Sequence, residues 1–152
     1  MRGGILTHLL AIGALSIALL AAADQPVAVV QAPDSPVRLD HLKVFPAEGD
    51  APAVLLYAAT NLTDNELEVF TVTVFVFDQD GRLKARQVAP GRRTLEGRST
   101  KYSAMVLDVG AIAPTDSLMA GVDQAQRTGS EQFWHVDLRT LAEQAVSAAR
   151  KR

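Results

Sequence analysis

Residues with catalytic or metal-binding chemistry are few in this sequence. It contains no cysteine, no serine within a G-x-S-x-G turn and no glycine-rich phosphate loop. After the first 23 residues two histidines remain, His41 and His135. His135 and Asp137 are spaced to share one strand face, but a metal site needs three or four ligands. We therefore expect no metal, no cofactor and no enzymatic activity, with a metal-dependent or hydrolytic enzyme as the alternative class.

Positive charge is concentrated in residues 82–101, which set seven basic side chains against one glutamate. The basic residues are Arg82, Lys84, Arg86, Arg92, Arg93, Arg98 and Lys101. The first three lie on one face of a predicted strand. Two interpretations follow. The segment binds an anionic glycan or envelope polymer through Lys84, Arg86, Arg92 and Arg93, or its charges protect an edge strand from pairing. We favour the second.

The segment LEVFTVTVFVFD, residues 67–78, alternates as a strand does but is apolar on both faces. The face assigned to the core consists of alternate apolar residues: Phe70, Val72, Val74 and Val76. On the other face Thr71 and Thr73 indicate partial exposure to water, whereas Phe75 and Phe77 are fully apolar. A strand with one wet side should be polar at alternate positions. The sequence therefore requires a cover for the second face.

Three covers are compatible with the sequence: the C-terminal helix, the aliphatic stems of Lys84 and Arg86, or a partner. We favour a cover from the same chain, because an isolated 13-residue helix is marginal in water and needs a surface of its own. An uncovered face at Phe75 and Phe77 would instead be a binding site. Trp134 is assigned to the core or to a helix contact, with a sugar-stacking platform as the alternative.

The elements that position these residues are mostly short strands. They are predicted at residues 37–45, 53–60, 67–78, 99–107, 117–126 and 131–136. Residues 53–60, AVLLYAAT, form a continuous apolar run that predicts a buried strand. Asp80-Gly81 predicts a two-residue type I′ hairpin turn, which pairs Phe77 with Lys84, Phe75 with Arg86 and Val76 with Ala85. Gly121 predicts a bulge or a close approach.

A helix is predicted at residues 138–150, capped by Asp137. Its apolar residues recur at helical spacing on one face: Leu138, Leu141, Ala142, Ala145, Val146 and Ala149. Seven or so short strands separated by turns predict an all-β, immunoglobulin-like antiparallel sandwich with one C-terminal helix. We expect one domain at residues 37–152, preceded by an extended lead-in at residues 24–36.

The first 23 residues have the pattern of a secretory signal peptide: Arg2, an apolar run and a small-residue site ending at Ala23. An uncleaved anchor is the alternative, and the lack of cysteine excludes a lipoprotein. The net charge is −2, which predicts neither nucleic-acid binding nor stable membrane insertion after cleavage. We expect an extracytoplasmic protein, periplasmic or secreted.

The segment TNLTDNELEVFTVTVFVFDQDGR, residues 60–82, resembles the core of bacterial extracytoplasmic immunoglobulin-like domains of the FxLYD type. Val74 to Asp78 take the place of the motif, with only the aspartate identical. The resemblance implies a β-sandwich without catalytic residues. Together these features predict a non-enzymatic binding or interaction module of the cell envelope, whose partner is an envelope protein or an anionic polymer.

Overall fold

A computed structural model describes residues 25–91 and 94–152 of the chain. Eight strands and one helix follow in order: β1 (Val27–Val29), β2 (Val37–Phe45), β3 (Val54–Asn61), β4 (Leu67–Phe77), β5 (Leu83–Pro90), β6 (Thr100–Val106), β7 (Ser117–Arg127), β8 (Phe133–His135) and α1 (Leu138–Arg150). The larger sheet has the order β1-β7-β4-β5, with β8 also paired to β7, and the smaller sheet has the order β2-β3-β6. The prediction of an all-β fold with one C-terminal helix is confirmed.

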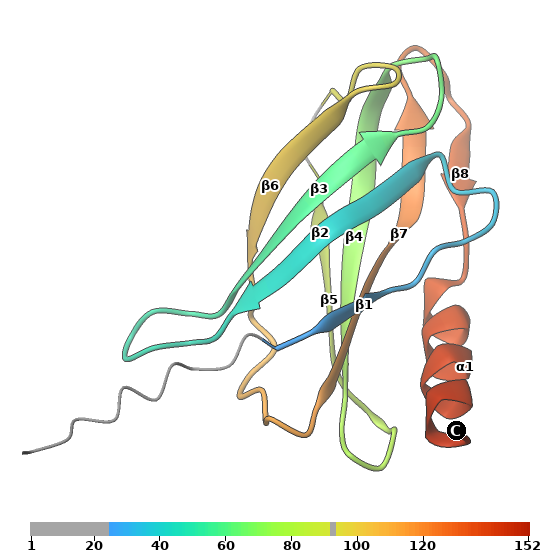
Figure 1. The fold of residues 1–152 in the computed structure, drawn as a ribbon. Helices are drawn as coiled ribbons and strands as arrows, with labels where there is room; N and C mark the ends of the chain where they lie inside the picture. Colours follow the sequence, from blue (N-terminus) through green and yellow to red (C-terminus); the bar gives the residue numbers. More distant parts are fainter. Residues whose placement is uncertain (1–24, 92–93) are drawn as a thin grey trace, which may run out of the picture.

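The two sheets pack face to face and enclose the main core (Figure 1). The smaller sheet contributes residues such as Val37, Leu39 and Leu55, and the larger sheet contributes Phe70 and Val72 among others. These positions alternate with outward-facing residues, as the two-residue period of a strand requires. The face of β4 that the sequence assigned to the core is therefore the inner face.

The predicted two-residue turn between β4 and β5 is wrong. The amide of Gly81 donates to the carbonyl of Asp78, and the amide of Asp78 donates to the carbonyl of Arg82, at 2.9 Å each. Gly81 has φ +76°, so this is a three-residue loop closed by a glycine bulge. It pairs Phe77 with Leu83 rather than with Lys84, and the register shifts again by one residue before Val76.

The second shift leaves Lys84 as an extra residue and restores the remainder of the predicted register. Phe75 lies opposite Arg86, and Val76 lies opposite Ala85. A glycine bulge and a second bulge three residues later therefore cancel each other. The expected side-chain orientation along most of β5 is correct although the turn is not.

The described part of the predicted lead-in, residues 25–36, packs into the larger sheet. It contains β1, which pairs parallel with β7, so the sheet is not purely antiparallel. Val30 and Ala32 are buried after it. Beside them lies Gly121, where an added Cβ would stand 2.4 Å from the carbonyl oxygen of Val30 and 2.9 Å from Leu138. The predicted close approach at Gly121 is therefore confirmed.

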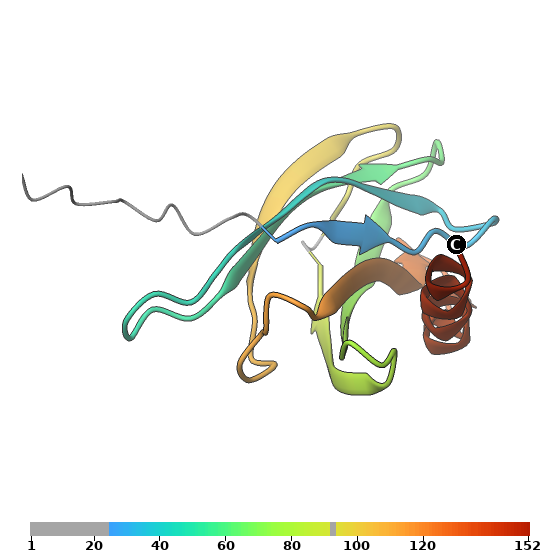
Figure 2. The same cartoon turned by 60° about the horizontal axis from the view of Figure 1, so that its bottom comes forward.

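Helix α1 covers the second face of β4, as predicted. It lies outside the larger sheet, beside β7 (Figure 2). A second apolar cluster forms between them from residues of the helix, of β4 and of β7: Val30, Phe75, Phe77, Met119, Leu138, Ala142 and Val146. Phe75 and Phe77 are fully buried. The expectation that Thr73 is partly wet is wrong, since it is also fully buried, opposite Gly121.

Candidate functional site

Phe75 and Phe77, candidates for a binding surface, lie beneath α1 with no exposed area. The helix starts at Leu138, directly after its cap, Asp137, whose carboxylate accepts a hydrogen bond from the amide of Thr140 at 3.2 Å. The hydrogen bonds from Thr140 also lower the pKa of Asp137. This face of β4 is therefore internal to the domain.

Two of the candidate basic residues, Lys84 and Arg86, pair with carboxylates of the same chain. The ammonium of Lys84 lies 2.6 Å from Asp116 Oδ2 and donates to the carbonyl of Ala111 at 2.8 Å. The Asp116 side chain is only 4% exposed, and the hydrogen bond from Lys84 lowers its pKa. Arg86 lies 3.7 Å from Asp123. These charges tie β5 to the rest of the domain.

Strand β5 is an edge strand of the larger sheet. Its charged residues, its bulge at Lys84 and its final Pro90 are the devices by which natural sheets block edge pairing. The other two candidate contacts, Arg92 and Arg93, lie outside the described residues. The two described candidates, Lys84 and Arg86, lie on an edge strand and pair with carboxylates of the same chain. These contacts agree with the interpretation that the basic residues protect an edge strand from pairing.

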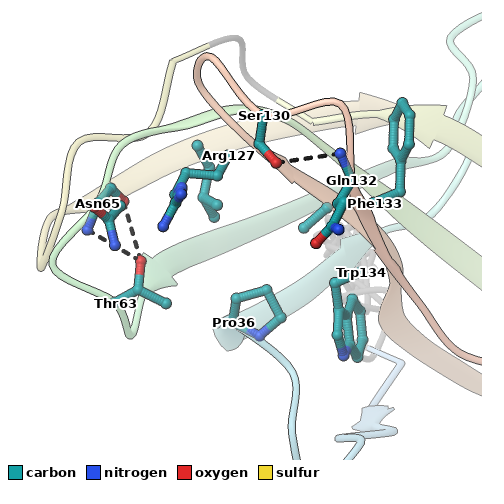
Figure 3. Close-up of a pocket in the computed structure, with 10 residues that line it drawn as sticks. Pro36, Thr63, Asn65, Arg127, Ser130, Gln132, Phe133 and Trp134 are labelled. Carbon is teal, nitrogen blue, oxygen red and sulfur yellow. Dashed lines mark hydrogen bonds between the residues drawn. The ribbon is translucent and has the colours of Figure 1, made fainter.

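Trp134 lines a pocket of about 440 Å³ at one end of the domain, shown in Figure 3. The pocket lies between the turn after β3 and the β7–β8 hairpin, with Thr63 and Asn65 on one side and Ser130 and Gln132 on the other. Trp134 is half-buried and packs against the main core. Its indole N–H is buried, and no described group accepts a hydrogen bond from it. The core assignment of Trp134 therefore describes its position better than an open stacking platform does.

The residues considered for metal binding do not form a metal site. Asp137 is used as the helix cap. Among the residues that the structure describes, no three histidine or acidic side chains are grouped as metal ligands would be.

The outer face of the smaller sheet carries a group of exposed apolar residues that the sequence analysis missed. Seven large apolar side chains are exposed in the described part of the chain, and four of them lie on this face: Phe45 (42%), Leu56 (39%), Tyr102 (68%) and Val106 (56%). The strand register places them together, because Val54 pairs with both Phe45 and Val106, and Leu56 pairs with Ala104. We call these four residues the outer apolar face.

Two side chains of β2, Lys43 and His41, border this face. Lys43 extends over the Phe45 ring, with Nζ 5.0 Å from the ring centroid. The ring of His41 stacks on Tyr102 with a centroid distance of 6.2 Å. A hollow of about 460 Å³ runs between His41 and Lys43 on one side and Tyr102 on the other, over Leu56.

The backbone of His41 is strained to place its ring there. Its φ is +53°, in the left-handed region that side-chain-bearing residues seldom occupy. The strain lies in an irregular part of β2, where the register with β3 shifts between Asp40 and Lys43. Strained residues of this kind occur preferentially at functional sites. Because of the shift, Lys43 and Phe45 lie on the outer face although Val37 and Leu39, at the same alternation earlier in β2, face the core.

The signal for this surface was present in the sequence, in residues 53–60. That apolar run predicted a strand buried on both faces, which is wrong for Leu56. Both β3 and β4 are apolar on two faces, but the sequence contains only one segment, residues 138–150, that predicts an amphipathic helix able to cover such a face. One helix covers one of the two strands, and the other keeps an open apolar face.

Comparisons of the chain with protein-family models, with curated proteins and with solved structures found no match.

Among the described residues, no helix has both the length and the apolar character needed to cross a membrane.

Proposed function

We propose that the chain is a non-enzymatic binding module that holds a partner protein on its outer apolar face. The observation that carries the proposal is the gathering of Phe45, Leu56, Tyr102 and Val106 on one sheet face with no element of the described chain over them. Clustered exposed apolar side chains mark interaction sites, whereas single ones are ordinary. The other three exposed apolar residues, Val29, Val88 and Phe133, are scattered over other strands.

The chemistry of the face favours a protein partner. Aromatic and aliphatic side chains at its centre supply the anchors that protein interfaces use. Completing the burial of one half-exposed side chain of this size contributes roughly 1 kcal/mol to binding. The four side chains of the face together therefore contribute several kcal/mol. Around the face, Asp40 is paired with Arg38 at 2.7 Å, and Lys43 lies over the ring of Phe45. A partner with apolar anchors complements this surface.

The anionic-polymer alternative has less support. Lys84 and Arg86 already face carboxylates within the chain, so a polymer would have to compete with those contacts. The outer apolar face also has no counterpart in that alternative, since a polyanion gains nothing from Leu56 and Val106.

The cell envelope is the proposed location, on the basis of the signal-peptide pattern at residues 1–23. We also propose an immunoglobulin-like topology, which the strand order supports. Taken in chain order from β2, the smaller sheet corresponds to strands A, B and E, and the sequence β8-β7-β4-β5 corresponds to G, F, C and C′. The FxLYD-type resemblance at residues 60–82 covers the β3–β4 turn and β4, which are strands B and C in this correspondence.

A size comparison tests the proposed function. Val106 and Val88 are both exposed valines on edge strands, so Val106→Lys and Val88→Lys are matched changes on and off the outer apolar face. In extracts of the producing cell, we expect the wild-type and Val88→Lys chains to migrate in a complex larger than the chain itself and Val106→Lys to migrate alone. A complex that survives Val106→Lys would overturn the proposal. If the purified chain alone dimerises and Val106→Lys abolishes the dimer, the occupant is a second copy rather than another protein.

A further inference from the structure

The open edge of β6 borders the outer apolar face and has unpaired backbone groups. The ladder between β3 and β6 continues at its ends through Leu107 N to Ala53 O at 2.8 Å and Asn61 N to Ser99 O at 2.9 Å. Odd-numbered residues of β6 therefore bond to β3, because hydrogen-bonded pairs alternate along an antiparallel ladder. The N–H and C=O groups of Tyr102 and Ala104 consequently point away from β3, toward the open edge.

The side chain of Gln87 closes this edge at one end, and a contact of Lys101 lies near the other end. Gln87 bridges from β5, donating to the carbonyl of Val106 at 2.9 Å and accepting from the amide of Asp108 at 2.7 Å. Near the other end, Lys101 donates to the carbonyl of Thr94 at 2.9 Å. Between these two contacts the structure shows no described group bonded to the outward backbone of Tyr102 or Ala104.

A groove of about 380 Å³ lies along this open part of the edge. One wall is β6 from Tyr102 to Ala104, and the other is Pro90 with Gly91 at the end of β5. The groove shares Tyr102, Ser103 and Ala104 with the hollow over Leu56, so it adjoins the outer apolar face.

The β6 edge also lacks the protection that β5 has. Strand β5 combines Lys84, Arg86, a bulge and Pro90, whereas the open part of β6 reads Tyr-Ser-Ala. An unprotected edge is a template for pairing with another chain. Peptide segments commonly bind proteins by adding a strand to such an edge.

From this arrangement we infer that an extended segment of the partner protein adds to β6 as a strand, pairing with the backbone of Tyr102 and Ala104. This inference rests on the proposed function and specifies how the partner binds. The segment is about four residues long where it pairs, since a strand advances about 3.3 Å per residue and the contacts of Lys101 and Gln87 lie at its two ends. Its alternate side chains are apolar and lie over the outer apolar face, and the intervening ones are small and face Pro90.

The test uses random linear heptapeptides displayed on phage and selected on the purified full chain. Ala104→Pro removes the outward N–H without removing a bond to β3, and proline is tolerated on edge strands. Ala104→Ser is the matched control that keeps the N–H. We expect the selected peptides to lose at least about tenfold in affinity on Ala104→Pro and little on Ala104→Ser. Methylating alternate backbone nitrogens of the peptide should weaken binding in the same way.

Hydrogen exchange on the wild-type chain gives a second readout if Ala104→Pro does not fold. The amides of Tyr102 and Ala104 should exchange rapidly in the free chain and become protected when the peptide binds. The selected peptides could instead lose affinity when Leu56 or Val106 is changed, keep their affinity on Ala104→Pro and protect neither amide. That result would overturn strand addition and leave the proposed function intact. If no selected peptide loses affinity when Leu56, Val106 or Ala104 is changed, both proposals are wrong.

Discussion

The cover of β4 by α1 predicts an energetic coupling between Phe75 and Leu138. Both belong to the apolar cluster beneath the helix, with Phe75 fully buried and Leu138 2% exposed. Truncating a buried phenylalanine to alanine costs about 3–5 kcal/mol, and a buried leucine about 2–5 kcal/mol. Because both changes enlarge the same cavity, we expect the free energy lost by the double variant to be about 1 kcal/mol less than the sum of the single losses.

Urea unfolding followed by circular dichroism measures the free energy of unfolding of the wild type, of the two single variants and of the double variant. Val72 provides the matched control, since it is fully buried on the opposite face of β4 and belongs to the main core. Val72→Ala combined with Leu138→Ala should be additive within about 0.5 kcal/mol. If the losses in free energy of unfolding from the Phe75 and Leu138 changes are also additive, the claim that the two residues share a cluster is refuted.

Three further outcomes follow from the structure. Thr73→Val should raise the free energy of unfolding by about 1 kcal/mol, because the buried hydroxyl of Thr73 has no hydrogen-bond partner among the described residues; a loss in thermal unfolding experiments would contradict this. Lys84 lowers the pKa of Asp116, so the stability from this carboxylate is complete above its ordinary pKa of about 4 and is lost as pH falls through the lower folded value. The stability advantage of the wild type over Asp116→Asn should therefore shrink below about pH 4 in urea titrations, and an advantage that grows with acid would be the wrong sign. Mass spectrometry of chain from the envelope fraction should give an N-terminus within a residue or two of Asp24, and Met1 on soluble cytoplasmic chain would exclude export.

The features that the sequence predicted well are those with a strong local pattern. The helix bounds at residues 138–150 agree with the structure because the apolar stripe is regular and Asp137 caps it. Its position on β4 could be inferred because Phe75 and Phe77 needed a cover and the helix needed a surface. Both requirements arise from burial of apolar area, which is readable in sequence.

The features that the sequence did not predict depend on contacts between distant segments. Val27–Val29 is too short to distinguish a parallel strand from a lead-in, and its place is fixed by β7, about 90 residues away along the chain. The bulge at Lys84 accompanies an ion pair to Asp116 that no local pattern encodes. The outer apolar face required knowing which of two double-faced strands the single helix covers.

The central claim is that the outer apolar face holds a partner protein, and site-specific photocrosslinking in the producing cell tests it most directly. The photoreactive p-benzoylphenylalanine would replace Tyr102, the most exposed residue of the face, or Val88 as the control on β5. The account predicts one discrete heterologous product from position 102 that disappears when Leu56→Lys is added, and no such product from position 88. No product from position 102, or the same products from both positions, would contradict it.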